Sequence, residues 1–127
     1  MSTPAMRVVI VGAGGCAREV EWLLREHNRS AGAETYRFVG YAVSDVSKLG
    51  PYDSRDLVLG DLDWLDQHRD RFDAFALAIG NPAARARVVA MLLPRFSEKH
   101  WPALCHPTAR FDEASCSLGE GTILCAG

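Results

Sequence analysis

The residues whose spacing best suits chemistry are small ones near the start of the chain. Gly12, Gly14 and Ala17 form a G-x-G-x-x-[GA] pattern that directly follows a short β-branched run, residues 7–11. Glycines leave backbone N–H groups open to a diphosphate, and the amino end of a following helix adds a partial positive charge. A purely structural tight turn is the alternative interpretation. The candidate phosphate-binding residues are Gly12, Gly14, Gly15 and Cys16.

Three more candidates follow two later apolar runs. Gly80 and Asn81 come after residues 72–79, and Asp45 comes after residues 36–43. Because the carboxyl ends of parallel strands line one crevice, we expect all three residues to belong to the same substrate site. Asn81 alternatively serves only as a helix cap. A dinucleotide site needs an acidic residue at the end of its second strand, and Asp45 comes later than that, which disfavours NAD.

No catalytic group and no metal site is predicted. The four cysteines are scattered without a C-x-x-C pair, which is more typical of buried thiols than of zinc ligands or disulfides. His106, followed by Pro107, is expected to set a turn, and the other histidines lie in polar, surface-like surroundings. Arg85 and Arg87 have the charge to approach a phosphate, but arginines at such positions often form the solvated face of a helix.

Alternating apolar runs and helical patterns must position these residues. Strands are predicted at residues 7–11, 36–43, 57–59, 72–79 and 101–105. Helices are predicted at residues 17–27, after Asp61 or Asp63, and from Pro82 to about Arg95. In the last of them, Val88, Met91 and Leu92 are expected to face inward. A polar loop is expected at residues 28–33, after the first helix. This order favours an α/β fold, a Rossmann-like parallel sheet with flanking helices.

The composition fits such a fold. The chain has 127 residues, 48% of them hydrophobic, and a formal charge of −2, which gives no general attraction for nucleic acid or an anionic membrane. No apolar run approaches the roughly 20 residues that span a bilayer. The first residues lack the order of a secretory signal, so a cytoplasmic protein is expected.

The last ten residues suggest a second domain. Leu118 and Leu124 are six positions apart with a Gly-x-Gly between them, which is typical of hexapeptide repeats. We therefore predict a Rossmann-like domain over residues 1–105, followed over residues 106–127 by the truncated start of a left-handed parallel β-helix. A glycine-rich turn before a final strand is the alternative.

Three motifs in this order resemble one group of enzymes. They are VGAGG at residues 11–15, AIGN at residues 78–81, and His106-Pro107 followed by LGEGT at residues 118–122. On these motifs, residues 7–127 resemble the hexapeptide-repeat sugar acyltransferases of the sialic acid O-acetyltransferase and UDP-bacillosamine N-acetyltransferase type. Such enzymes serve polysaccharide biosynthesis.

The resemblance implies that the first domain binds a UDP-sugar. It also implies that acetyl-CoA is the co-substrate, bound between the β-helices of a homotrimer at a site mostly beyond Gly127, and that no metal takes part. The general base would be a histidine further along the β-helix. No catalytic residue is therefore expected in this chain, and we expect the chain alone not to transfer acetyl groups.

Two positions depart from the family pattern. Cys16 stands where the family often has histidine beside the sugar, and Val43-Ser44 stand where paired aspartates are common. Two alternatives stay open, an NAD(P)-binding oxidoreductase domain and a non-catalytic regulatory or interaction module.

Overall fold

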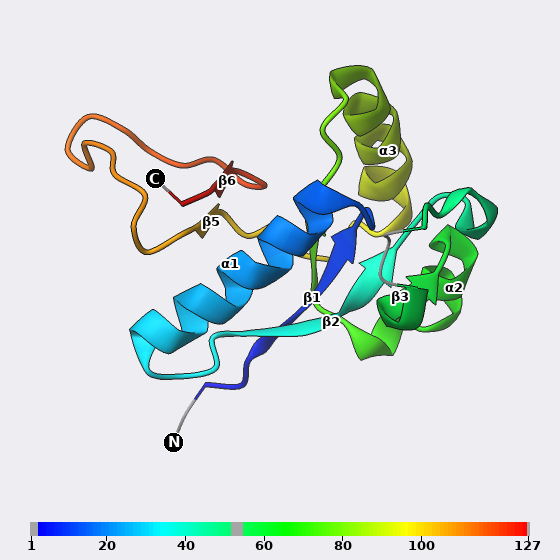
Figure 1. The fold of residues 1–127 in the computed structure, drawn as a ribbon, viewed down its shortest axis with the longest axis horizontal. Coiled ribbons are helices and arrows are strands. Elements are labelled where there is room, and N and C mark those ends of the chain that lie inside the picture. Colours follow the sequence, from blue (N-terminus) through cyan, green and yellow to red (C-terminus); the bar gives the residue numbers. More distant parts are fainter. Residues whose placement is uncertain (1–2, 52–54, 127) are drawn as a thin grey trace.

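Four parallel strands form the centre of the fold (Figure 1). The structure, a computed structural model, describes residues 3–51 and 55–126. The strands are β1 (Met6–Val11), β2 (Tyr36–Ala42), β3 (Val58–Gly60) and β4 (Ala74–Leu77), in the order β3-β2-β1-β4. The predicted α/β fold, a parallel sheet with flanking helices, is confirmed.

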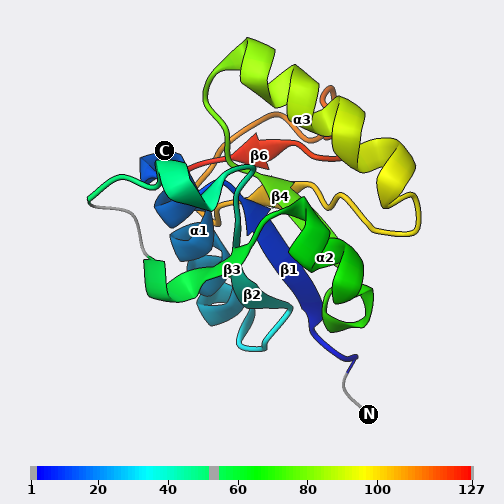
Figure 2. The ribbon, with the colours of Figure 1, turned by 90° about the vertical axis from the view of Figure 1, so that its right-hand side faces the viewer.

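Helices cover both faces of this sheet. They are α1 (Gly15–Ala31), α2 (Leu62–Gln67) and α3 (Pro82–Arg95), with short 3-10 turns at Val46–Lys48, Arg55–Leu57 and Arg69–Arg71. Side chains alternate along β1, so that Val8 and Ile10 pack with α1 while Val9 and Val11 pack with α2 and α3. Figure 2 shows α1 on one side of the sheet and α2 on the other. None of the described helices is long and apolar enough to cross a membrane.

The first helix is longer than its sequence pattern predicts. It continues through Asn28 to Ala31, so the expected loop at 28–33 is wrong over its first four residues. The helix stops at Gly32, which adopts a left-handed conformation (φ 67°) and donates its N–H to the carbonyl of Arg29. The Asn28 side chain accepts hydrogen bonds from the N–H groups of Thr35 and Tyr36, which fixes the start of β2.

The strand order places a change of direction beside β1. The chain runs outward from β1 through β2 to β3, and then crosses to the opposite side of β1 to form β4. The carboxyl ends of β1 and β4 therefore belong to connections that leave in opposite directions. In open parallel sheets, ligands bind in the crevice at such a point.

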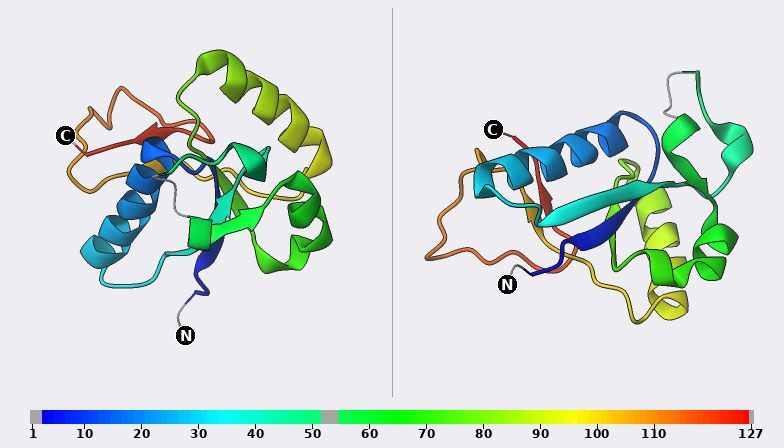
Figure 3. Two further views of the ribbon diagram at one scale, coloured as in Figure 1. Left: turned by 45° about the vertical axis from the view of Figure 1, so that its right-hand side comes forward. Right: turned by 90° about the horizontal axis from the view of Figure 1, so that it is seen from below.

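The C-terminal segment forms a separate small sheet. Strand β5 (Leu104–Cys105) pairs in parallel with β6 (Ile123–Leu124), and the chain between them extends away from the main sheet (Figures 1 and 3). The described part of this segment has no further strand, so the regular coils of a hexapeptide β-helix are not present in it.

The predicted fifth strand is wrong in both extent and partner. Only Leu104–Cys105 is extended as a strand, and it pairs with β6 instead of the main sheet. Next to β4, the described residues add only a single bridge to the main sheet, between Ala74 and His100. Leu104 is buried against α1 and β1, which draws the chain away from the sheet edge.

Candidate ligand-binding site

The turn between β1 and α1 is held by both neighbouring strands. The N–H of Gly12 donates to the carbonyl of Ala42 at 2.8 Å, and the N–H of Ala78 donates to the carbonyl of Val11 at 2.9 Å. Gly12 has a φ of +128°, and a Cβ on it would lie 2.5 Å from the carbonyl oxygen of Ala78. Only glycine fits this backbone, and its presence lets the turn pass directly over the end of β4.

The next two glycines leave open space. A Cβ on Gly14 would meet no described heavy atom within 4 Å, and one on Gly15 would meet only the Arg18 guanidinium, at 3.8 Å. Gly14 caps α1 without a side-chain hydrogen bond, and the first turn of α1 contains no acidic residue. Cys16 lies exposed in this same turn. The space beside Gly14 and Gly15 is therefore open to the first N–H groups of α1, and the first turn itself adds no carboxylate that would repel an anion.

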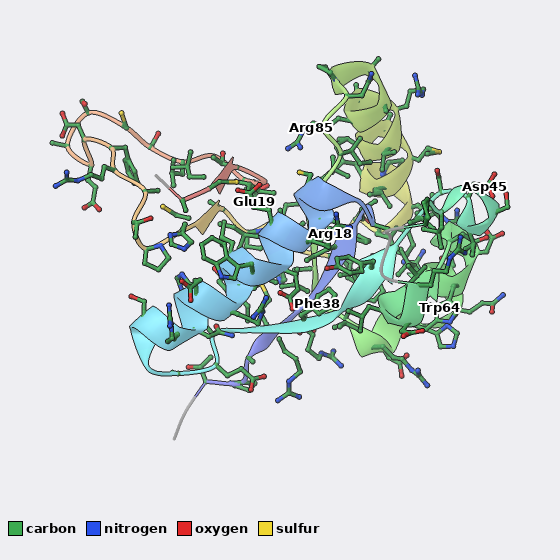
Figure 4. The ribbon with its side chains drawn as sticks, viewed as in Figure 1. Arg18, Glu19, Phe38, Asp45, Trp64 and Arg85 are labelled. Atoms are coloured by element: carbon green, nitrogen blue, oxygen red, sulfur yellow. The ribbon has the colours of Figure 1, made fainter. Side chains whose placement is uncertain are left out.

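Arg18 brings positive charge to this corner (Figure 4). Its guanidinium lies beside Gly15, and its positive charge also affects the pKa of Tyr41 near the end of β2. Burial raises the pKa of Tyr41 and the charge of Glu21 raises it further, while Arg18 opposes the shift. Arg18 thus places a positive charge beside the glycine turn.

The turn between β4 and α3 lies on the other side of β1. A Cβ on Gly80 would meet none of the described atoms within 4 Å, so this turn is also open. The Oδ1 atom of Asn81 accepts a hydrogen bond from the N–H of Ala84 at 2.9 Å, so Asn81 is the helix cap of α3. Arg85 donates to the carbonyl of Leu77 at 3.1 Å, which ties α3 to the end of β4.

Asp45 shapes the loop after β2. Its Oδ1 atom accepts hydrogen bonds from the N–H of Ser47, at 3.0 Å, and from the Ser47 hydroxyl, at 2.6 Å. These bonds cap the 3-10 turn Val46–Lys48. The neighbouring residue Ser44, not Asp45, lines the cleft described next.

A cleft of about 660 Å³ lies between the carboxyl ends of the strands and α3. Its lining residues come from the ends of β1, β2 and β4 and from α2 and α3: Val11, Gly12, Val43, Ser44, Leu62, Ile79, Ala84, Arg87, Val88, Ala90 and Met91. The walls are mostly apolar, and Arg87 is the charged side chain among them. Of the seven predicted site residues only Gly12 lines this cleft, and the other six lie in the turns that adjoin it.

Most of the cleft wall was missed by sequence reasoning. Met91 was expected to face inward with Leu92, but its side chain is 45% exposed and lines the cleft, whereas Leu92 is fully buried. Both residues belong to one apolar stripe, and a stripe alone does not show where a helix overhangs the sheet edge. Leu62 and Ile79 also belong to apolar stretches of the sequence, and such stretches do not show which residues line a cleft.

The histidines lie away from the cleft. His106 is only 4% exposed, with its ring stacked on Trp22 at 4.8 Å and its Nδ1 accepting from the N–H of Thr108 at 3.1 Å. Its Nε2 has no hydrogen-bond partner among the described residues and lies 3.8 Å from Glu26. His68 stacks on Trp64, and neither His27 nor His100 lines the cleft. No group of three metal-ligating side chains occurs among the described residues.

One protein family matches most of the chain. The family model described as the PglD N-terminal domain matches residues 7–92. The chain belongs to this family. The match covers β1, the glycine turn, the β4–α3 turn and most of α3. None of the curated protein sequences matches this chain.

Solved structures of acetyltransferases share the fold. A mutant of perosamine N-acetyltransferase from Caulobacter crescentus, solved with CoA and GDP-perosamine, superposes on the whole chain with a TM-score of 0.75 and 24% identity. PerB from the same organism, solved with the same ligands, gives 0.72 and 26% over the whole chain. The acetyltransferase domain of PglB from Neisseria gonorrhoeae, solved with acetyl coenzyme A, gives 0.69 and 22% over 97% of the chain. This chain spans about 55% of the length of the Caulobacter enzymes and 54% of the PglB acetyltransferase domain.

Proposed function

We propose that this chain is the nucleotide-sugar-binding part of an acetyl-CoA-dependent sugar acetyltransferase. The observation that carries the proposal is the open first turn of α1 at the point where the strand order reverses. We expect its N–H groups, which no side chain blocks, to face the crevice that contains the cleft beside α3. Membership of the PglD N-terminal domain family supports the assignment.

The two parts of the site suit two parts of a nucleotide sugar. The diphosphate would lie over Gly14, Gly15 and Cys16, with Arg18 as a further positive charge. The mostly apolar cleft would hold the nucleobase and ribose, with Ser44 and Arg87 as its polar groups. The resemblance in the sequence favours a UDP-sugar, whereas the Caulobacter enzymes were solved with a GDP-sugar. A nucleoside diphosphate sugar is the class that both observations share.

The transfer step is assigned to a longer protein. Attack of a sugar amine or hydroxyl on the thioester of acetyl-CoA needs a general base near the sugar. His106 is buried against Trp22, and no described histidine lines the cleft, so we propose none of the described histidines for this role. We assign the general base and the acetyl-CoA site to a β-helix that residues 106–127 begin. In the intact protein, three such β-helices would form a homotrimer. By this proposal the chain alone binds the nucleotide sugar without turning it over.

Calorimetry with UDP, GDP and NAD tests the binding step. We expect one of the two nucleoside diphosphates to bind and NAD to bind at least about tenfold more weakly. Preferential binding of NAD would favour the oxidoreductase alternative, since it would show recognition of a second nucleoside. No affinity for any of the three would favour a regulatory module in which the glycine turn is only structural.

A substitution at Gly14 tests the position of the phosphates. Gly14 is the helix cap, has open space above it and has a φ of −85°, so Gly14→Asp and Gly14→Asn should both fold and cap α1. Asp adds a negative charge where the diphosphate would lie, while Asn has the same size without the charge. We expect Gly14→Asp to lose at least tenfold more affinity than Gly14→Asn. Equal affinities of the two variants would show that the phosphates lie elsewhere.

A further inference from the structure

One face of α3 is turned toward α2. Arg95, the last residue of α3, pairs with Asp63 at 2.8 Å and with Asp66 at 2.5 Å, and both carboxylates belong to α2. Residues four apart lie on the same face of a helix, so Met91 and then Arg87 continue this face toward the start of α3. Both Met91 and Arg87 line the cleft. The face of α3 that is fixed to α2 at one end therefore borders the proposed nucleotide site at the other.

The cleft continues into a smaller cavity beside the start of α2. This second cavity has a volume of about 160 Å³ and is lined by Ser44, Asp61, Leu62, Asp63 and Met91. Ser44, Leu62 and Met91 line the main cleft as well, so the two cavities adjoin. The described residues around the main cleft include no carboxylate, and the acidic groups are found only in the second cavity.

Arg87 and Asp61 bring opposite charges to these cavities, and no ion pair neutralises either of them. Neither side chain pairs with the other or with any further residue that the structure describes. The Oδ1 atom of Asp61 accepts a hydrogen bond from the N–H of Trp64 at 3.1 Å, and Oδ2 has no partner among the described residues. Asp63, in contrast, is already paired with Arg95. A ligand that extends through both cavities would therefore meet a free donor at Arg87 and a free acceptor at Asp61.

We propose that Arg87 and Asp61 make this site selective for guanine, so that the substrate is a GDP-sugar. The inference rests on the proposed function, because it assumes that a nucleobase occupies the cleft. The Arg87 guanidinium would donate to O6 and N7 of guanine, the pairing that arginine most often makes with this nucleobase. The Asp61 carboxylate would accept from N1–H and from the amino group at C2. Leu62 and Met91, which line both cavities, would contact the two faces of the ring.

The other common nucleobases match this pair of side chains less well. Uracil has one donor, N3–H, between two carbonyl oxygens, so a carboxylate that faces this donor also lies near two partial negative charges. Adenine has an amino group beside N7, so an arginine there meets a donor. Cytosine offers a single amino group to a carboxylate. Guanine alone has two adjacent acceptors and two adjacent donors.

Calorimetry with GDP, UDP, CDP and ADP on this chain tests the selectivity. We expect GDP to bind at least about tenfold more tightly than each of the other three. Tighter binding of another nucleotide would overturn the guanine assignment and leave the proposed function standing. Absence of binding for all four would overturn the proposed function, and this inference with it.

Inosine diphosphate tests the contact at Asp61. It differs from GDP only in lacking the amino group at C2, so the wild-type chain should bind it at least about fivefold more weakly than GDP. Asp61→Asn keeps the size and the capping ability of the side chain, so α2 should still form. In this variant the difference between GDP and inosine diphosphate should shrink by at least about threefold, because the charge is lost. An unchanged difference would overturn the role of Asp61.

Asp63→Asn is the matched control for that variant. It removes a carboxylate from the same cavity, but one that is paired with Arg95, so the preference for GDP should stay within about twofold of wild type. Arg87→Gln should weaken GDP binding by at least about tenfold and UDP binding by less than about threefold. Equal losses for GDP and UDP would show that Arg87 acts on the ribose or the phosphates, and would overturn its role in guanine recognition.

Discussion

The Asp73 carboxylate holds Arg7 at three points. It accepts hydrogen bonds from the guanidinium at 3.1 and 2.9 Å and from the backbone N–H of Arg7 at 2.9 Å. These bonds join the start of β1 to the residue that precedes β4, at the edge of the sheet opposite the cleft. The Arg7 guanidinium lowers the pKa of Asp73 to about 2.

This pair gives a prediction for stability against pH. The depressed pKa means that the folded state favours the carboxylate, so the stabilisation is present above about pH 4 and is lost as pH falls toward 2. Because both side chains are more than a third exposed, we expect Asp73→Asn to cost only about 1 kcal/mol at pH 7. Urea unfolding at pH 7 and pH 2.5 measures the effect. The gap between wild type and variant should shrink at the lower pH, and a constant gap would contradict the pKa assignment.

A methyl group at Gly12 should strain the turn. Gly12→Ala would place its Cβ against the Ala78 carbonyl in a backbone conformation that alanine rarely adopts. We expect a loss of about 2–4 kcal/mol in the free energy of unfolding. Gly14→Ala is the control, because its Cβ meets open space, and it should cost less than about 1 kcal/mol. Equal losses for the two variants would show that the turn is not as close to β4 as described.

Neighbouring residues on α3 should respond differently to truncation. Leu92 is fully buried, so Leu92→Ala should cost about 2–5 kcal/mol. Met91 is 45% exposed, so Met91→Ala should cost less than about 1 kcal/mol. If the cleft holds the nucleobase, Met91→Ala should weaken nucleotide binding by several-fold even though it costs little stability. Thermal unfolding and calorimetry on the same samples separate the two effects.

The attachment of β6 should depend on Ile123. Its side chain packs against the cluster under α1, so Ile123→Asp would place a charge in an apolar contact. The Leu104 and His106 N–H groups, which donate to the carbonyls of Thr122 and Leu124, should then exchange with solvent at least about tenfold faster. Amides of β1 should keep their protection, because the main sheet does not include β6. Loss of protection in β1 as well would show that the two sheets fold as one unit.

Much of the fold could be predicted because local signals agreed. The run that forms β1 is apolar on both faces, as a central parallel strand requires, and Asn81-Pro82 marked the start of α3 correctly. Helix α1 extended further than expected because Gly32 is a stronger stop signal than the polar residues before it.

The pairing of β5 and the cleft wall could not be predicted in the same way. The partner of Leu104 lies nineteen positions later in the register, at Ile123, and both strands are only two residues long, too short to carry a pattern. The cleft wall depends on how α3 lies across the sheet edge, which apolar spacing does not specify. The predicted binding roles all stay predictions, for Gly12, Gly14, Gly15, Cys16, Asp45, Gly80 and Asn81.

Helix α1 is shared by both sheets. One of its faces packs on the parallel sheet through Val20 and Leu24, and the same helix supports β5 and β6 and stacks Trp22 on His106. Its first turn is also the place where a phosphate would be held. A tilt of this helix on ligand binding would therefore move β5 and β6 with it, because Leu104 and Ile123 pack in the cluster that the helix covers.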